Sequence, residues 1–196
     1  MTTTDYAARL TIDYPGRELD PLSTGLHIFY VIPIVIVLGA VAASNGAGGA
    51  VLVVPALLMI VFRQKYPRWW FDFDLGVTRF ATRVTSYLAL MSDTYPSTDE
   101  EQYVHLELDY PDVRRDLNRW MPLIKWFLVI PHIIVLAFLS IGAAFAAIGA
   151  WFAILFTGRY PRSVFGYIEG VMRWWLRVAA YAFLLITDEY PPFQLR

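Results

Sequence analysis

The sequence predicts an all-α integral membrane protein built from two tandem repeats. Each repeat is expected to hold a short β-strand, a transmembrane helical hairpin and an amphipathic interfacial helix. Three observations lead to this fold class: the composition, two long windows without charge, and an internal repeat. Of the 196 residues, 57% are hydrophobic and 17% are charged, and the mean hydropathy is +0.46. Because soluble domains carry about 25% charged residues, this chain has too little polar surface to cover itself in water.

The composition also excludes several classes of function. The chain has no cysteine, which rules out disulfides, thiolate catalysis and cysteine-ligated metals. Its formal net charge of −1 gives no reason to expect nucleic-acid binding. No acid–base pair, phosphate-binding loop or nucleophile–histidine spacing is recognisable. We therefore expect no enzyme activity, no cofactor and no metal.

Residues 26–62 and 126–157 form two windows that contain no Lys, Arg, Asp or Glu. Each is longer than the roughly 20 residues that one membrane-spanning helix needs. Each is interrupted by small residues, at 44–49 and at 140–142. We therefore predict two hairpins, at 24–64 and 120–158, with helices at 24–43, 49–64, 120–140 and 143–158. The second helix of each hairpin is short, so a dip into the bilayer without full crossing stays an alternative.

The basic residues beside the hairpins predict their orientation. Both hairpins return to the side from which they enter, and all nearby Lys and Arg lie on that side: Arg63, Lys65, Arg68, Arg119, Lys125, Arg159 and Arg162. Lys and Arg in short loops mark the cytoplasmic side of a membrane. The expected location is the bacterial inner membrane, multipass, with the N- and C-termini cytoplasmic.

An internal repeat is visible in matched segments along the chain. Residues 10–15 (LTIDYP) return as 106–111 (LELDYP), and Tyr-Pro-Arg at 66–68 returns at 160–162. At constant offset, Phe71, Gly76, Arg79, Arg83 and Tyr87 match Phe165, Gly170, Arg173, Arg177 and Tyr181. The predicted boundaries are 7–96 for repeat 1, 97–102 for a linker and 103–193 for repeat 2.

Each repeat opens with a predicted short strand. Leu10 and Ile12 alternate with polar residues, as do Leu106 and Leu108. A lone short strand is unstable in water. We therefore hypothesise that the two strands pair with each other across a pseudo-twofold axis.

Each repeat closes with a predicted amphipathic helix, at 75–92 and at 163–187. Each helix carries two arginines four residues apart, which share one helical face. A spanning arrangement would place these arginines in the bilayer interior, at about 2.5–3.5 kcal/mol each. A helix lying flat in the cytoplasmic interface lets them reach phosphates, so we expect the flat arrangement.

The candidate site consists of the matched charged residues Arg79, Arg83, Arg173, Arg177, Glu169, Asp13 and Asp109. In one interpretation the arginines bind anionic phospholipid headgroups, such as cardiolipin. In the other they are structural and pair with Glu169 and the strand carboxylates, Asp13 and Asp109. A separate residue, His132, is interpreted as a neutral histidine bonded to a carbonyl that Pro131 leaves free.

Several motifs resemble a known family. They are Asp109-Tyr110-Pro111, Trp126 with Pro131-His132, the run Phe156-Thr157-Gly158-Arg159-Tyr160-Pro161-Arg162, Arg173-Trp174, and Asp188-Glu189-Tyr190-Pro191-Pro192-Phe193. Together they resemble the bacterial family called domain of unknown function 4389. The resemblance is weaker in repeat 1, where Gln64-Lys65 replaces the expected Thr-Gly. It implies a small multipass membrane protein with no assigned activity.

The expected function is that of a non-enzymatic accessory or scaffold protein. Through its Gly/Ala-rich segment at 142–150 it would associate with a larger membrane complex or with itself. Anionic lipid is the expected small partner. The alternative is a small channel or transporter with its pathway between the two repeats.

Overall fold

The computed structural model describes residues 6–16, 30, 32–36, 39, 50–98, 100 and 102–195. The elements in chain order are β1 (Ala8–Ile12), α2 (Ala50–Leu58), a π-helical turn η2 (Met59–Arg63), α3 (Arg68–Leu88), β2 (Val104–Leu108), α4 (Val113–Asp116), α5 (Met121–Leu128), α6 (Ile130–Thr157) and α7 (Arg162–Ala182).

The two predicted strands pair with each other as an antiparallel sheet. Leu10 faces Leu106 at the centre, Ala8 faces Leu108 at one end, and Ile12 faces Val104 at the other. Exchanging each residue for its counterpart in the other repeat leaves this set of pairs unchanged. The register therefore confirms the hypothesis of a pseudo-twofold relation between the strands.

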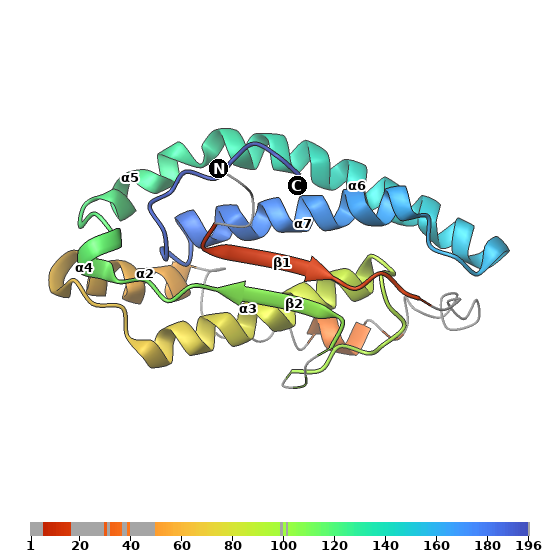
Figure 1. Cartoon of the computed structure of the whole chain (residues 1–196), viewed down its shortest axis with the longest axis horizontal. Helices are drawn as coiled ribbons and strands as arrows, with labels where there is room; N and C mark the ends of the chain where they lie inside the picture. The colour runs from red at the N-terminus through yellow and green to blue at the C-terminus, as the bar shows by residue number, and fades with distance from the viewer. Residues whose placement is uncertain are drawn as a thin grey trace.

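The main elements form a stack in which α6 packs on α7, α7 on β1, β1 on β2, and β2 on α3 (Figure 1). Both α3 and α7 begin directly after a proline, Pro67 and Pro161, whose fixed φ suits the residue before a helix. The core lies between the sheet and these helices, and side chains of both strands contribute to it. The sheet is thus enclosed by one long helix from each repeat.

The predicted second hairpin is wrong, because α6 is one helix without interruption from Ile130 to Thr157. The small residues at 140–142 lie inside it. A Cβ on Gly142 would lie 2.7 Å from the hydroxyl of Tyr167 on α7, and that hydroxyl donates to the Leu139 carbonyl oxygen. Glycine in a helix costs only about 1 kcal/mol relative to alanine. The glycine therefore marks a close helix–helix approach rather than a turn.

The prediction of a four-pass, all-α membrane protein is corrected accordingly. Within the described residues one helix, Ile130–Thr157, is long and apolar enough to cross a membrane. In repeat 1, α2 and η2 occupy most of the predicted helix at 49–64. The predicted helix at 24–43 lies outside the described residues apart from scattered positions, and the turn at 44–49 lies wholly outside them. The observed fold is mostly helical with a small two-stranded sheet.

Left-handed backbone positions confirm the internal repeat. Gln64 ends η2 with φ 48°, and its counterpart Gly158 ends α6 with φ 67°. Leu90 follows α3 with φ 62°, and its counterpart Leu185 follows α7 with φ 57°. The chain therefore leaves matched helices by matched bends, even where repeat 1 lacks the glycine.

A glycine at position 64 should stabilise the protein. Left-handed conformation costs an L-residue about 1–2 kcal/mol, and glycine avoids this cost. Gln64→Gly should therefore raise the free energy of unfolding by about 1 kcal/mol, measured by urea denaturation in detergent. Lys65→Gly, at a neighbour without positive φ, is the control and should be destabilising. Equal effects of the two substitutions would contradict the assignment.

Candidate functional site

Matched arginines bond the outer edges of the two-stranded sheet. Arg173 Nε on α7 donates to the Leu10 carbonyl oxygen at 3.0 Å, and Arg79 Nε on α3 donates to the Leu106 carbonyl oxygen at 3.0 Å. An unpaired peptide group at a sheet edge needs a partner when it is removed from water. Each bond crosses between repeats, because each helix serves the strand that the other repeat contributes.

Glu169 completes the cluster in repeat 2 only. One of its carboxylate oxygens lies 2.7 Å from Arg173 Nη2 and accepts a hydrogen bond from the Ile12 amide at 3.2 Å. Both charged side chains are largely buried, at 22% exposure for Arg173 and 16% for Glu169. The counterpart of Glu169 in repeat 1 is Leu75, which has no acceptor. Arg173 is therefore held by internal partners on several sides.

The second arginine of each pair is buried deeper. Arg177 is 2% exposed and Arg83 is 4% exposed. Arg83 Nη1 donates to the Ser97 carbonyl oxygen at 2.9 Å, while its Nε has no hydrogen-bond partner among the described residues. Burial lowers the pKa of Arg177; the charge of Arg173 acts in the same direction and Tyr6 opposes it. Neither guanidinium lies at the surface, where a lipid headgroup would need it.

Asp13 and Asp109 lie on the outer face of the sheet, apart from the helix arginines. Asp109 accepts two hydrogen bonds from Arg9, at 2.6 and 3.0 Å. Asp13 lies 3.0 Å from His105 Nε2. These two contacts are also matched, because Arg9 and His105 are counterparts in the repeats. The structure therefore joins the strand carboxylates to the partner strand.

An ion pair with a buried lysine lies outside the predicted site. Lys125 on α5 is fully buried, and its Nζ lies 2.7 Å from Asp188 Oδ1 and donates to the Thr187 carbonyl oxygen at 2.6 Å. Burial lowers the pKa of Lys125, and Asp188 opposes that shift. The available sequence signal was Asp188-Glu189-Tyr190-Pro191, which repeats Asp93-Thr94-Tyr95-Pro96 of the first copy. The pair fastens α5 to the segment that follows α7.

His132 has a different partner from the one predicted. Its Nδ1 accepts a hydrogen bond from Trp174 Nε1 at 3.0 Å, and its ring stacks on Phe193 with centroids 3.8 Å apart. The interpretation of a histidine bonded to a backbone carbonyl is therefore wrong. The contacts make His132 a packing residue between α6, α7 and the C-terminal segment.

Asp74 on α3 is a buried carboxylate with one weak partner. It is 3% exposed, the Tyr66 hydroxyl donates to its Oδ2 at 3.2 Å, and its Oδ1 has no partner among the described residues. Burial raises the pKa of Asp74 to about 6, and the bond from Tyr66 opposes this. Its counterpart in repeat 2 is Ile168, an ordinary core residue.

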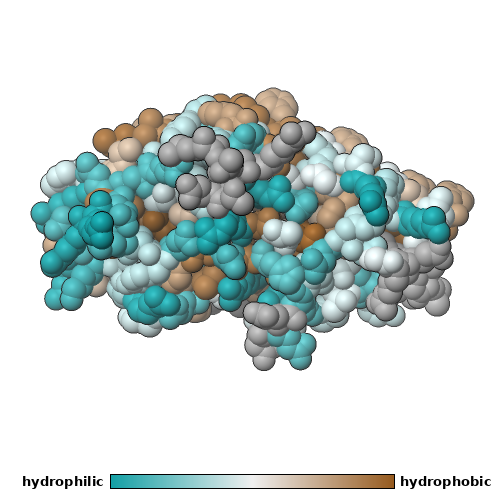
Figure 2. All heavy atoms as spheres, in the orientation of Figure 1, coloured by the Kyte–Doolittle hydropathy of each residue, from teal (hydrophilic) through white to brown (hydrophobic). Residues whose placement is uncertain are grey.

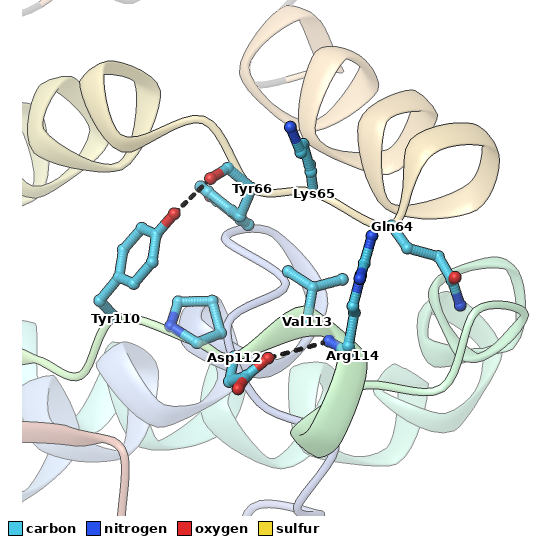
Figure 3. Close-up of a pocket in the computed structure, with 8 residues that line it drawn as sticks. Gln64, Lys65, Tyr66, Tyr110, Asp112, Val113 and Arg114 are labelled. Atoms are coloured by element: carbon cyan, nitrogen blue, oxygen red, sulfur yellow. Dashed lines mark hydrogen bonds between the residues drawn. The ribbon is translucent and has the colours of Figure 1, made fainter.

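A surface cavity of about 510 Å³ lies between the turn before α3 and the turn before α4. Tyr110 donates to the Tyr66 carbonyl oxygen across its floor, and Asp112 accepts from the Arg114 amide (Figure 3). The Arg114 side chain reaches toward Gln64, whereas Lys65 extends away from Tyr110 (Figure 3). The cavity holds no paired acid and base, and the described residues include no group of three or more metal-ligating side chains.

The fold and these contacts define a protein of two interlocked helical repeats around a shared sheet, with one long apolar helix at its surface. The family described as Domain of unknown function (DUF4389) matches residues 21–98 and again residues 119–194, so the chain belongs to this family in two tandem copies. No curated protein and no solved structure matches the chain.

Removing Arg173 should destabilise the fold more than removing Arg79. Arg173→Ala leaves Glu169 partly buried without its cation and the Leu10 carbonyl without its donor, so we expect a loss of about 3–5 kcal/mol of unfolding free energy. Arg79→Ala removes one hydrogen bond and should cost about 1–2 kcal/mol. Urea denaturation measures both, with the exposed Arg9→Ala as the control, expected to change less than about 1 kcal/mol. Equal losses at Arg173 and Arg9 would contradict the structural role.

Asp74 should make stability depend on pH in the acid range. Its folded pKa of about 6 exceeds the ordinary value of 3.8, so the folded state binds the proton more tightly than the unfolded state. Stability from this group is present below pH 3.8 and is lost as pH rises through 6. Asp74→Asn should therefore be more stable than the wild type at pH 7.5 by on the order of 1–3 kcal/mol, with the difference vanishing near pH 4.

The control for this measurement is Asp72→Asn, at an exposed position on the same helix. It should change the unfolding free energy by less than about 1 kcal/mol at both pH values. A constant difference between wild type and Asp74→Asn from pH 4 to 7.5 would contradict the assignment.

Proposed function

We propose that this protein is a non-enzymatic membrane accessory protein that lies on the bilayer with the outer face of α5 and α6 in lipid. This α5–α6 face consists of Leu123, Phe127, Ile134, Phe138, Ile141, Phe145, Ile148, Phe152 and Phe156. All are exposed, up to 85% for Phe156. They recur every three or four residues along α6 and so form one stripe. Figure 2 shows apolar atoms along this edge, while hydrophilic atoms cover much of the surface around the sheet.

The single observation that carries the proposal is the length of this exposed apolar stripe. Soluble monomers rarely expose a contiguous apolar patch of more than a few hundred Å². Burial of one Phe or Leu side chain is worth about 1.5–3 kcal/mol. A stripe of such residues along the 28-residue α6 therefore favours transfer into an apolar phase, and a lipid surface supplies one along its whole length.

An in-plane orientation fits the neighbouring charges better than a spanning one. Trp175 Nε1 donates to Ser140 Oγ at 2.9 Å, which fixes the middle of α6 beside α7. Arg173 lies two residues before Trp175 on α7, and it bonds the sheet at the same level. A spanning α6 would therefore carry the sheet and its exposed charged residues, Arg9 and Asp109, toward the hydrocarbon. That costs about 2.5–3.5 kcal/mol for each charge, whereas in-plane contact leaves the sheet in water.

The ends of the α5–α6 face carry residues suited to lipid headgroups. Trp120 and Trp126 are 59% and 46% exposed near its start, and indole rings favour the membrane interface. Arg119 and Arg159 are exposed beside its two ends, so anionic phospholipid is the favoured surface. The opposite side, with its ion-paired sheet, is the side available to other membrane proteins.

Charged substitutions on the α5–α6 face should weaken lipid attachment. The variant with Phe138→Asp and Phe145→Asp places two carboxylates where lipid contact is proposed, and its partition to vesicles should fall by at least about tenfold. Flotation with phosphatidylglycerol vesicles measures the partition. Trp69→Asp, at a 69% exposed position on α3, is the matched control and should float as the wild type does.

Two outcomes contradict the proposal. One is equal flotation of the double variant and the wild type. The other is a cysteine-labelling pattern in which introduced cysteines beside Pro122 and Gly158 are reached from opposite sides of a sealed vesicle, since that shows a spanning α6.

A further inference from the structure

We propose that a pocket between α3 and β2 binds an oxyanion, a carboxylate or phosphate group carried by a water-soluble molecule. The pocket has a volume of about 270 Å³. It is lined by Gly76, Arg79 and Arg83 of α3, by Thr98, and by residues 104–107 of β2. The matched place in repeat 2 holds oxygen acceptors that the described part of repeat 1 lacks.

In repeat 2 the chain itself fills that place. Arg173 there has three acceptors: the Leu10 carbonyl through Nε, Glu169 through Nη2, and the Leu195 carbonyl through Nη1 at 3.4 Å. The C-terminal segment lies so close to α7 that a Cβ on Gly170 would be 2.7 Å from the Leu195 carbonyl oxygen. Oxygen acceptors from the same chain thus surround the guanidinium.

In repeat 1 no described residue fills the corresponding place. Arg79 bonds the Leu106 carbonyl through Nε, and its two terminal nitrogens have no acceptor among the described residues. Leu75 replaces the glutamate. A Cβ on Gly76, the counterpart of Gly170, would meet nothing within 4 Å. Arg79 therefore faces a cavity where Arg173 faces two oxygen acceptors.

The charges around the pocket favour an anion. Arg83 is buried, and its Nε has no partner in the described part of the chain. Glu107 already pairs with Arg9 at 3.3 Å, and His105 contacts Asp13 at 3.0 Å. The guanidinium groups of Arg79 and Arg83 have no carboxylate partner among the described residues. A carboxylate or phosphate offers the pair of oxygens that an arginine binds best.

The position of the pocket indicates the source of the anion. Residues of α3 and β2 line the pocket, and α3 lies at the opposite end of the stack from α6 (Figure 1). With the α5–α6 face in lipid, the pocket opens to water, so the choice of a soluble anion over a headgroup rests on the proposed function. The anion site itself does not depend on that choice.

Inorganic phosphate and citrate are the probes for this pocket. Titration calorimetry with the purified full chain in detergent, at constant ionic strength, should show saturable binding of one or both. Arg79→Ala should weaken binding by at least about tenfold through loss of a charge-assisted bond. Gly76→Leu should weaken it similarly by filling the cavity without changing the charge. Because leucine forms helices better than glycine, this variant should fold at least as well as the wild type.

The matched control is Arg115→Ala, which removes the same charge at an exposed position outside the pocket and should bind as the wild type does. Absence of saturable binding, or binding that survives Gly76→Leu, overturns the anion site. If Arg79→Ala lowers flotation with phosphatidylglycerol vesicles but leaves phosphate and citrate binding unchanged, the soluble source is overturned in favour of a headgroup. Unchanged flotation together with lost phosphate or citrate binding supports the proposal.

Discussion

The structure depends on hydrogen bonding at the outer edges of a sheet that has only two strands. Such a pair has a free edge on each side and is not stable alone. Arg173 and Arg79 bond these edges from helices packed against them. Since each arginine serves the strand that the other repeat contributes, neither repeat holds a complete folding unit. The two copies therefore complete one shared sheet-and-helix unit.

The same framework leaves room for the copies to differ. Repeat 2 fills its positions with internal partners: Glu169 at the arginine, Ile168 in the core and the C-terminal segment over the helix. Repeat 1 has Leu75 and Asp74 at the first two of these positions. A guanidinium without a carboxylate partner, as at Arg79, and a buried carboxyl group, as at Asp74, both lower the free energy of unfolding. The two repeats therefore differ at this position, with internal acceptors around Arg173 in repeat 2 and a cavity beside Arg79 in repeat 1.

The sequence predicted the features that depend on local residue patterns, which are the two repeats and their strands. Matched motifs showed the two repeats, the alternation at Leu10 and Leu106 showed the strands, and symmetry indicated their pairing. It also selected the arginines and Glu169 as a partner of Arg173, though not the strand carbonyls that Arg173 and Arg79 bond. The direction in which Arg173 points is set by the strand of the other repeat, at a sequence separation that no local pattern records. The burial of Lys125 was missed for the same reason, because Asp188 reaches it from beyond α7.

The wrong hairpin arose because small residues inside a long charge-free window were interpreted as a turn, whereas α6 continues through them. A charge-free window suits a helix that crosses lipid, and it also suits a helix such as α6 that packs one side on the protein and exposes an apolar side. Ser140 and Gly142 resemble a turn in sequence, yet they receive Trp175 and Tyr167 from α7. In the proposed orientation, the charges that disfavour a spanning α6 lie on the sheet one layer behind α7, far from α6 in sequence.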